Sequence, residues 1–389
     1  MNSFLVILLS VAILVTMALL WKNRDDFSED STEPEPEDIR VTPLLRGINY
    51  LLSDKPDQAL QEMVQVAKIR SESAEVYMAL GEMFRTQGEY GRAVRIHQNL
   101  LARPDVSADF HFQAYVSLGR DFQAGGLLDR ALKHYEKALA IQSDHLESLY
   151  SCLRIREQSH EWEDAEWLVS RLEQIKDKSY HEHRAYLKAE MAKNAFDQGN
   201  LDECNRLVIE ALQLSSECSH AHLLRIQYLI KQEQYSDAID QVRSFLTEVK
   251  VEHHPLLPKT LMMNAEFYKQ FAEPFLLEAW HQHHDIELGV TWVEALAKHQ
   301  SVKDAKILQE KLVLRDLSLR HELRLLALDN TENNLVQQTK YWRLSMKHYA
   351  CKQCGVQVHA MRWHCPKCNS WGSMEPVQTS HTFGEEERA

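Results

Sequence analysis

Four cysteines near the C-terminal end are the residues whose spacing most clearly indicates chemistry. They form two Cys-x-x-Cys pairs separated by ten residues. Each pair makes a tight turn that directs two sulfur atoms at one ion, and two such turns complete a tetrahedral shell of four thiolates. Gly355 and Asn369 follow the pairs, and both residue types accept the left-handed backbone conformation that such turns need. The spacing predicts one metal site with four ligands: Cys351, Cys354, Cys365 and Cys368.

The ion is expected to be structural, and it is either zinc or iron, since four thiolates accept both. Zinc is favoured because nothing else in the chain supplies a redox partner site. An iron site would permit electron transfer, so an electron carrier stays an alternative. A Cys3His site using His359 or His364 is a further alternative, although four well-spaced cysteines make it unnecessary.

The two-knuckle arrangement resembles a rubredoxin or a zinc ribbon. So short a module cannot bury enough core to fold alone, and its folding therefore depends on the metal and on a surface to dock against. Tyr349, Trp363 and Trp371 are expected to pack about the knuckles, and the segment Trp363–Trp371 is the expected docking face.

The surroundings of the cysteines leave RNA binding open as a rival function. No acidic residue occurs from Asn333 to Met374, whereas six basic ones do. The whole chain, however, carries a formal net charge of −13, which makes it a poor general binder of nucleic acid. We expect this basic face to complement an acidic partner surface within the chain rather than RNA. The basic residues are Lys340, Arg343, Lys347, Lys352, Arg362 and Lys367.

A repeating helical pattern precedes the cysteines and must position them. The stretches from Leu80 and from Leu118 share a Leu-Gly pair, an aromatic residue three positions after the Gly, a second Gly and then an Ala. This is the tetratricopeptide pattern, and small residues are needed where its helices approach closely. The alanine position of the repeat recurs along the chain, and the pattern fades after Phe245. This position is occupied by Ala59, Ala93, Ala131, Ala165, Cys204 and Ala238.

We therefore predict an all-α fold, a tetratricopeptide superhelical solenoid of about eight or nine hairpins that carries a small four-cysteine ribbon. The uncharged stretch Phe4–Trp21 is long enough for a transmembrane helix, and Lys22 and Arg24 after it predict that the body of the protein faces the cytoplasm. A cleaved signal peptide is the alternative, disfavoured because no Lys or Arg precedes the stretch and no clear cleavage site follows. The expected divisions are an anchor (1–22), an acidic disordered linker (23–40), the repeats (41–346), the ribbon (347–376) and a flexible tail (377–389).

The remaining reactive side chains are expected to be structural. Cys152 and Cys204 fall on packed repeat positions, and Cys218 lies near a repeat junction. The histidine-rich stretches His181–His183 and His281–Asp285 are expected on helix surfaces or in the groove rather than on a metal. No nucleotide-binding, hydrolase or metalloprotease motif occurs, so no enzymatic activity is expected.

The order of these parts resembles the lipopolysaccharide assembly protein B family of Gram-negative bacteria. The matching stretches are "GINYLLSDKPDQAL", "LGEMFRTQGEYGRAVRIHQNLL", "LGRDFQAGGLLDRA" and "YACKQCGVQVHAMRWHCPKCNSWGSMEP". The resemblance implies a non-enzymatic adaptor at the bacterial inner membrane that presents the deacetylase LpxC to the membrane protease FtsH. It also implies other inner-membrane lipopolysaccharide assembly proteins as partners and a ribbon that binds metal and packs on the repeats. Homo-oligomerisation stays open.

Overall fold

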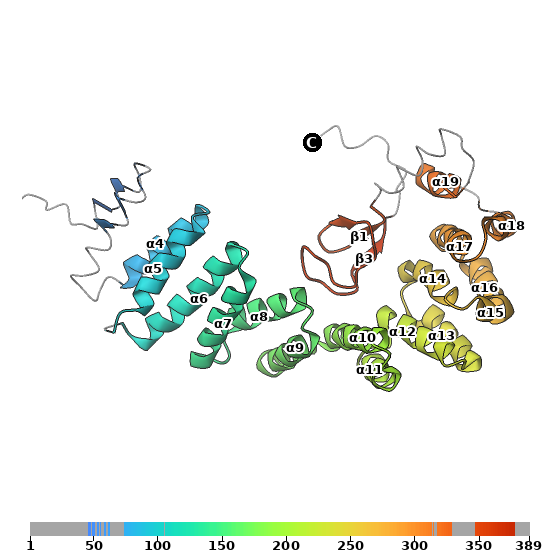
Figure 1. Ribbon diagram of the computed structural model, residues 1–389, viewed down its shortest axis with the longest axis horizontal. Helices are drawn as coiled ribbons and strands as arrows, with labels where there is room; N and C mark the ends of the chain where they lie inside the picture. Colours follow the sequence, from blue (N-terminus) through green and yellow to red (C-terminus); the bar gives the residue numbers. More distant parts are fainter. Residues whose placement is uncertain are drawn as a thin grey trace, which may run out of the picture. The chain divides into compact units, whose positions relative to one another are not determined.

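The computed structural model describes residues 74–328 except 105, 313, 315 and 316, residues 347–377, and scattered positions between 46 and 62. Helices dominate, and three short strands follow near the C-terminal end (Figure 1). The chain packs as two compact units, residues 1–134 and 135–389, whose boundary falls within one helix. The predicted all-α repeat region with a small terminal ribbon is therefore present in the part of the chain that the structure describes.

Between residues 74 and 248 ten helices follow each other in helix–turn–helix order, as the repeat pattern predicts. In the first unit α4 packs on α5. In the second unit α8 packs on α9, α10 on α11 and α12 on α13. Their bounds are α4 (Ala74–Thr86), α5 (Tyr90–Leu101), α6 (Ala108–Ala124), α7 (Leu128–Ile141), α8 (Leu146–Gln158), α9 (Trp162–Lys176), α10 (His181–Asp197), α11 (Leu201–Leu214), α12 (Ser219–Lys231) and α13 (Tyr235–Glu248).

The small residues of the repeat pattern lie where the helices touch. All six predicted alanine-position side chains, including Cys204, are 0% exposed. In the first unit a Cβ on Gly81 would lie 2.3 Å from Nε2 of His97, so a larger residue at position 81 of α4 would collide with this side chain of α5. Close approach of paired helices thus explains the small residues.

The helices become irregular after Phe245, where the sequence pattern fades. A 3₁₀ turn and a π turn interrupt the hairpins, and each alters the direction in which the next side chains point. The core nevertheless stays continuous, because Phe267, Trp292 and Leu308 are buried together. The elements are η2 (Val251–Leu256), α14 (Leu257–Leu261), α15 (Ala265–Phe267), η3 (Tyr268–Ala272), α16 (Glu273–His283), α17 (Ile286–His299), α18 (Val302–Leu312) and α19 (Leu319–Leu326).

The three scattered cysteines are core residues, as predicted. Cys152, Cys204 and Cys218 are at most 2% exposed, and none forms a disulfide. Burial raises the pKa of Cys152 to about 12 and that of Cys204 to about 11. These thiols therefore stay protonated and unreactive at neutral pH.

The predicted anchor, the linker and the tail beyond residue 377 lie outside the described residues, as do residues 329–346 at the end of the predicted repeat region. Within the described residues, every helix is too short or too polar to span a bilayer. The membrane anchor thus stays a prediction from the sequence.

Candidate metal centre and its docking surface

The C-terminal ribbon is a three-stranded antiparallel sheet in the order β2–β1–β3. The central strand pairs Ala350 with Gln357 on one side and with Glu375 on the other. The sheet holds the first cysteine at its end, because Cys351 lies opposite Met374. Its strands are β1 (Tyr349–Cys351), β2 (Gln357–Val358) and β3 (Met374–Pro376).

The two Cys-x-x-Cys turns have the same backbone geometry. In the first, Gly355 N–H donates to the carbonyl of Cys351 at 2.8 Å, and in the second, Asn369 N–H donates to the carbonyl of Cys365 at 3.0 Å. Gly355 has φ +70° and Asn369 has φ 57°, both left-handed. The predicted conformations at both positions are confirmed.

The four cysteines form a rubredoxin-like metal site. Their ligand atoms all lie within 4.8 Å of one another. The sulfur atoms of Cys351 and Cys368 are 3.6 Å apart, and those of Cys354 and Cys365 are 3.7 Å apart. A tetrahedral ion with metal–sulfur bonds of about 2.3 Å separates its ligands by about 3.8 Å, so the donor set fits a single ion. No histidine completes a metal cluster among the described residues, which leaves the four cysteines as the ligands.

Two serines that the sequence analysis overlooked support the thiolates. Ser373 Oγ lies 3.3 Å from the sulfur of Cys351, and Ser370 Oγ lies 3.0 Å from the sulfur of Cys368. Burial raises the pKa of Cys351, but hydrogen bonds from both serines and from backbone N–H groups outweigh it and lower that pKa to about 5. Hydrogen-bond donors to sulfur thus favour the ligating form of the site.

Trp371 connects the ribbon to the helices through a buried carboxylate. Its indole N–H donates to Glu157 on α8 at 2.9 Å, and Nε2 of His183 on α10 lies 2.6 Å from the same oxygen. The other oxygen of Glu157 is 3.4 Å from Nε2 of His364. Burial disfavours the charge of Glu157, yet hydrogen bonds and the nearby His183 and His364 lower its pKa to about 2. Both parts of the chain therefore contribute to one polar cluster.

Trp363 packs against two hydrophobic cores of the second unit. Its ring stacks on His220 of α12, with centroids 5.0 Å apart, and meets the ring of His253 on η2 edge to face at 5.6 Å. His253 also lies 3.2 Å from the carbonyl oxygen of Met374 and 2.6 Å from Ser219 Oγ. Because the carbonyl only accepts, Nε2 of His253 must donate to it, and Nδ1 then accepts from the Ser219 hydroxyl.

Gly372 allows the ribbon backbone to reach the helices. Its φ is +58°, and a Cβ there would lie 2.4 Å from the hydroxyl of Tyr186 on α10. The ring of Tyr186 stacks on Trp371 with centroids 5.9 Å apart. The expected docking face, Trp363–Trp371, is therefore the face that packs on the repeats, and Gly372 extends it.

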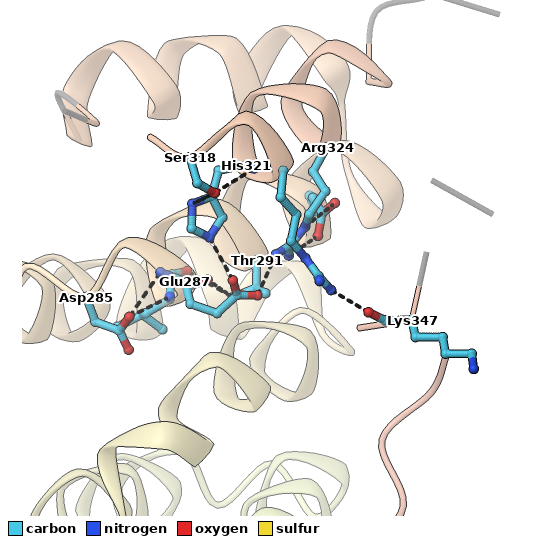
Figure 2. Close-up of polar contacts among 10 residues, drawn as sticks. Asp285, Glu287, Thr291, Ser318, His321, Arg324 and Lys347 are labelled. Carbon is cyan, nitrogen blue, oxygen red and sulfur yellow. Dashed lines mark hydrogen bonds and ion pairs between the residues drawn. The ribbon is translucent and has the colours of Figure 1, made fainter. Parts of the chain in front are cut away.

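A second polar contact lies where the ribbon begins. Figure 2 shows Glu287 of α17 between His321 and Arg324 of α19. Arg324 is buried and also donates to Glu294 at 2.7 Å. A neighbouring arginine, Arg320, donates to the backbone carbonyl of Lys347 at 2.7 Å. These bonds join the last described helix to the start of β1.

The expectation that basic residues around the knuckles pair with an acidic surface of the repeats is wrong for the four that the structure describes. The other two, Lys340 and Arg343, lie outside the described residues. Lys347, Lys352, Arg362 and Lys367 are exposed, and within the described residues the only ion pair among these four joins Lys352 to Glu375 of the ribbon itself. Aromatic rings, histidines and one buried carboxylate hold the ribbon instead.

Comparisons with known proteins agree with both parts of the chain. Residues 349–376 match the family described as "Rubredoxin metal binding domain". Lipopolysaccharide assembly protein B of Escherichia coli K12 is 22% identical over 347 residues, covering 85% of this chain and 88% of that protein. The protein of the same name from Haemophilus influenzae Rd is 26% identical over 354 residues, with the same coverage.

Solved structures match at low similarity. The apo form of RapI is 14% identical and covers 78% of this chain and 86% of that chain, with a TM-score of 0.38. The TPR2AB domain of yeast Sti1 in its pHSP90 complex is 12% identical and covers 71% and 99%, with a TM-score of 0.34. The pairwise packing of the helices, and not these solved structures, identifies the helical repeat. The resemblance of this chain to lipopolysaccharide assembly protein B is confirmed over 85% of its length.

Proposed function

We propose that this chain is a non-enzymatic adaptor in lipopolysaccharide assembly. The observation that carries the proposal is the similarity to lipopolysaccharide assembly protein B, which spans 85% of the chain rather than the repeats alone. Stacked helical hairpins offer extended surfaces to proteins and peptides, which suits a role in bringing partners together.

The finer part of the proposal is that the adaptor promotes degradation of the lipid A deacetylase LpxC by the membrane protease FtsH. The N-terminal stretch Phe4–Trp21 would anchor the chain in the inner membrane, with the repeats and the ribbon facing the cytoplasm. A reducing cytoplasm keeps the four cysteines as thiols and thiolates, which supports this orientation.

Docking of the ribbon supports a protein partner over RNA. Proteins that bind single-stranded RNA stack bases on exposed aromatic rings. Trp363 and Trp371 instead stack on His220 and Tyr186 of the repeats, so those ring faces are already covered.

Depletion of the chain tests the proposal. LpxC half-life and lipopolysaccharide content would be measured in depleted cells that express either the wild type or Cys365→Ser. We expect LpxC to persist longer on depletion, and wild type but not Cys365→Ser to restore its turnover. Trp167→Phe is the matched control, because Trp167 is 62% exposed and lies on α9. Unchanged LpxC turnover on depletion would contradict the proposal.

A further inference from the structure

A hollow of about 390 Å³ lies between the ribbon and the last repeats, and we name it the seam hollow. Helices α14, α17 and α19 form one side of it, and β1 and the loop after β2 form the other. It therefore exists only while the ribbon is docked. Its lining includes Leu256, Lys259, Lys298, His299, His359 and Met361.

Positive groups gather on one wall of the seam hollow. Lys259 comes from α14, and Lys298 and His299 come from the last turn of α17. All three side chains are exposed, and no carboxylate among the described residues lies within ion-pair distance of either lysine. Partial desolvation lowers the pKa of His299, and the charges of Lys298 and Lys259 lower it further, so its imidazole is neutral at neutral pH. Both lysines therefore lie close enough to His299 to disfavour its protonation, and they carry the positive charge of this wall.

The acidic residues of the seam hollow pair with Arg324 and not with the lysines of this wall. Glu287 is held by Arg324 at 2.5 Å and by His321 at 3.0 Å, and Glu294 is held by Arg324 at 2.7 Å (Figure 2). Burial raises the pKa of Glu287, but its bonds to His321 and Arg324 outweigh that effect and lower the pKa to about 2. Both carboxylates are therefore engaged with the arginine beneath them.

The local helix dipole explains only part of the pattern. Lys298 and His299 complement the negative C-terminal end of α17. Lys259 belongs to another helix, and His359 reaches the same hollow from the ribbon. An anion placed among these groups would relieve the repulsion between them. The chain has a net charge of −13, so the positive charge of this wall is opposite in sign to that of the chain as a whole.

We propose that the seam hollow binds an acidic peptide segment of a partner protein, with a carboxylate between Lys259, Lys298 and His299. The apolar side chains of Leu256 and Met361 line the same hollow and suit an apolar residue next to the acid. Arginine forks and helix N-terminal N–H groups are the donors that most favour phosphate, whereas lysine ammonium groups pair equally with carboxylates. The arginine that lines the hollow, Arg324, is already bound by Glu287 and Glu294.

The test measures binding of a defined probe to the full-length, zinc-loaded chain in non-ionic detergent. Fluorescence anisotropy would follow a fluorescein-labelled Gly-Glu-Leu-Glu-Gly peptide at low salt, and the same peptide with both glutamates replaced by glutamine. We expect the acidic probe to bind at least about tenfold more tightly, and added salt to remove the difference.

Charge reversal tests the location. Lys259→Glu combined with Lys298→Glu should weaken binding of the acidic probe at least about tenfold. Lys269→Glu combined with Lys303→Glu is the matched control, because both residues are exposed and lie outside the seam hollow. Circular dichroism checks that both variants fold.

Equal affinity for the two probes, or equal loss in both double variants, would overturn the inference. Displacement of the acidic probe by inorganic phosphate at lower concentration than by acetate would overturn the assignment to a carboxylate. The inference goes beyond the proposed function because it concerns a peptide-binding site and not LpxC turnover. The binding assay contains only the purified chain and the probe, without LpxC or FtsH. A failure here therefore leaves the LpxC experiment unaffected.

Discussion

Replacing Trp371 with phenylalanine isolates the hydrogen bond that joins the ribbon to the repeats. The aromatic ring is kept, so contacts with Tyr186 and Trp162 are largely preserved. The indole N–H is lost, and Glu157, which is 3% exposed, keeps only His183 and His364 as partners. A hydrogen bond to a buried charged group contributes about 1.5–3 kcal/mol.

A loss of about 2 kcal/mol raises the undocked fraction of ribbons about 30-fold. Because the ribbon depends on docking for part of its stability, undocked molecules should lose metal faster. The assay is the rate of zinc transfer to a chromogenic chelator, together with the thermal unfolding midpoint. We expect faster transfer from Trp371→Phe than from wild type, by a factor of about 30 if metal leaves only after undocking.

Trp167→Phe provides the control, since Trp167 is exposed and is not among the partners of Glu157. A double-mutant cycle with Glu157→Gln then assigns the effect to the contact itself. If Trp371→Phe released zinc no faster than Trp167→Phe, the reasoning about the buried carboxylate would be refuted.

Three further predictions concern the same docked ribbon. Gly372→Ala should destabilise docking by about 1–3 kcal/mol because of its positive φ and the approach of Tyr186, and Tyr186→Phe should recover part of this; chelator kinetics compare the single and double variants. Cys365→Ser should remove the bound metal and unfold the ribbon while leaving most helical signal, as elemental analysis and circular dichroism would show; a metal content equal to wild type would contradict the four-cysteine site. Burial lowers the pKa of His253 to about 4 and that of His220 to about 3, so both are neutral when docked, and an unfolded chain gains protons below about pH 6.5. Each should therefore cost about 1.4 kcal/mol of stability at pH 5.5 relative to neutral pH, and a thermal midpoint that does not fall between pH 7 and pH 5.5 would contradict their burial.

The repeats and the metal ligands were predictable because both follow from spacing along the chain. Small residues recur at a helical-repeat period, and the structure places Ala93, Ala165 and Cys204 fully inside. The two Cys-x-x-Cys turns are local as well, since Gly355 and Asn369 take the conformations that their positions require. Local rules of this kind need no knowledge of distant contacts.

The docking partners were not predictable, because they depend on which distant surfaces meet. Glu157 lies 214 residues before Trp371, and nothing in its own helix indicates that an acid there would be buried. The same holds for His253, which contacts Met374 across 121 residues. The basic residues around the cysteines suggested an ionic contact that the structure does not contain among the described residues. Composition shows the charge of a segment but not which of its side chains face an interface.

The separation between Glu157 and Trp371 has a consequence for how the protein is made. A ribosome synthesises α8 and α10 well before it adds the ribbon, and closing so long a loop is slow and entropically unfavourable. Until translation passes Trp371, the ring of Tyr186 on α10 lacks its cover and can attract chaperones or aggregate. A truncated chain and a chain without metal would both leave the ring of Tyr186 uncovered. The quality-control machinery of the cell would therefore recognise both defects through the same exposed ring.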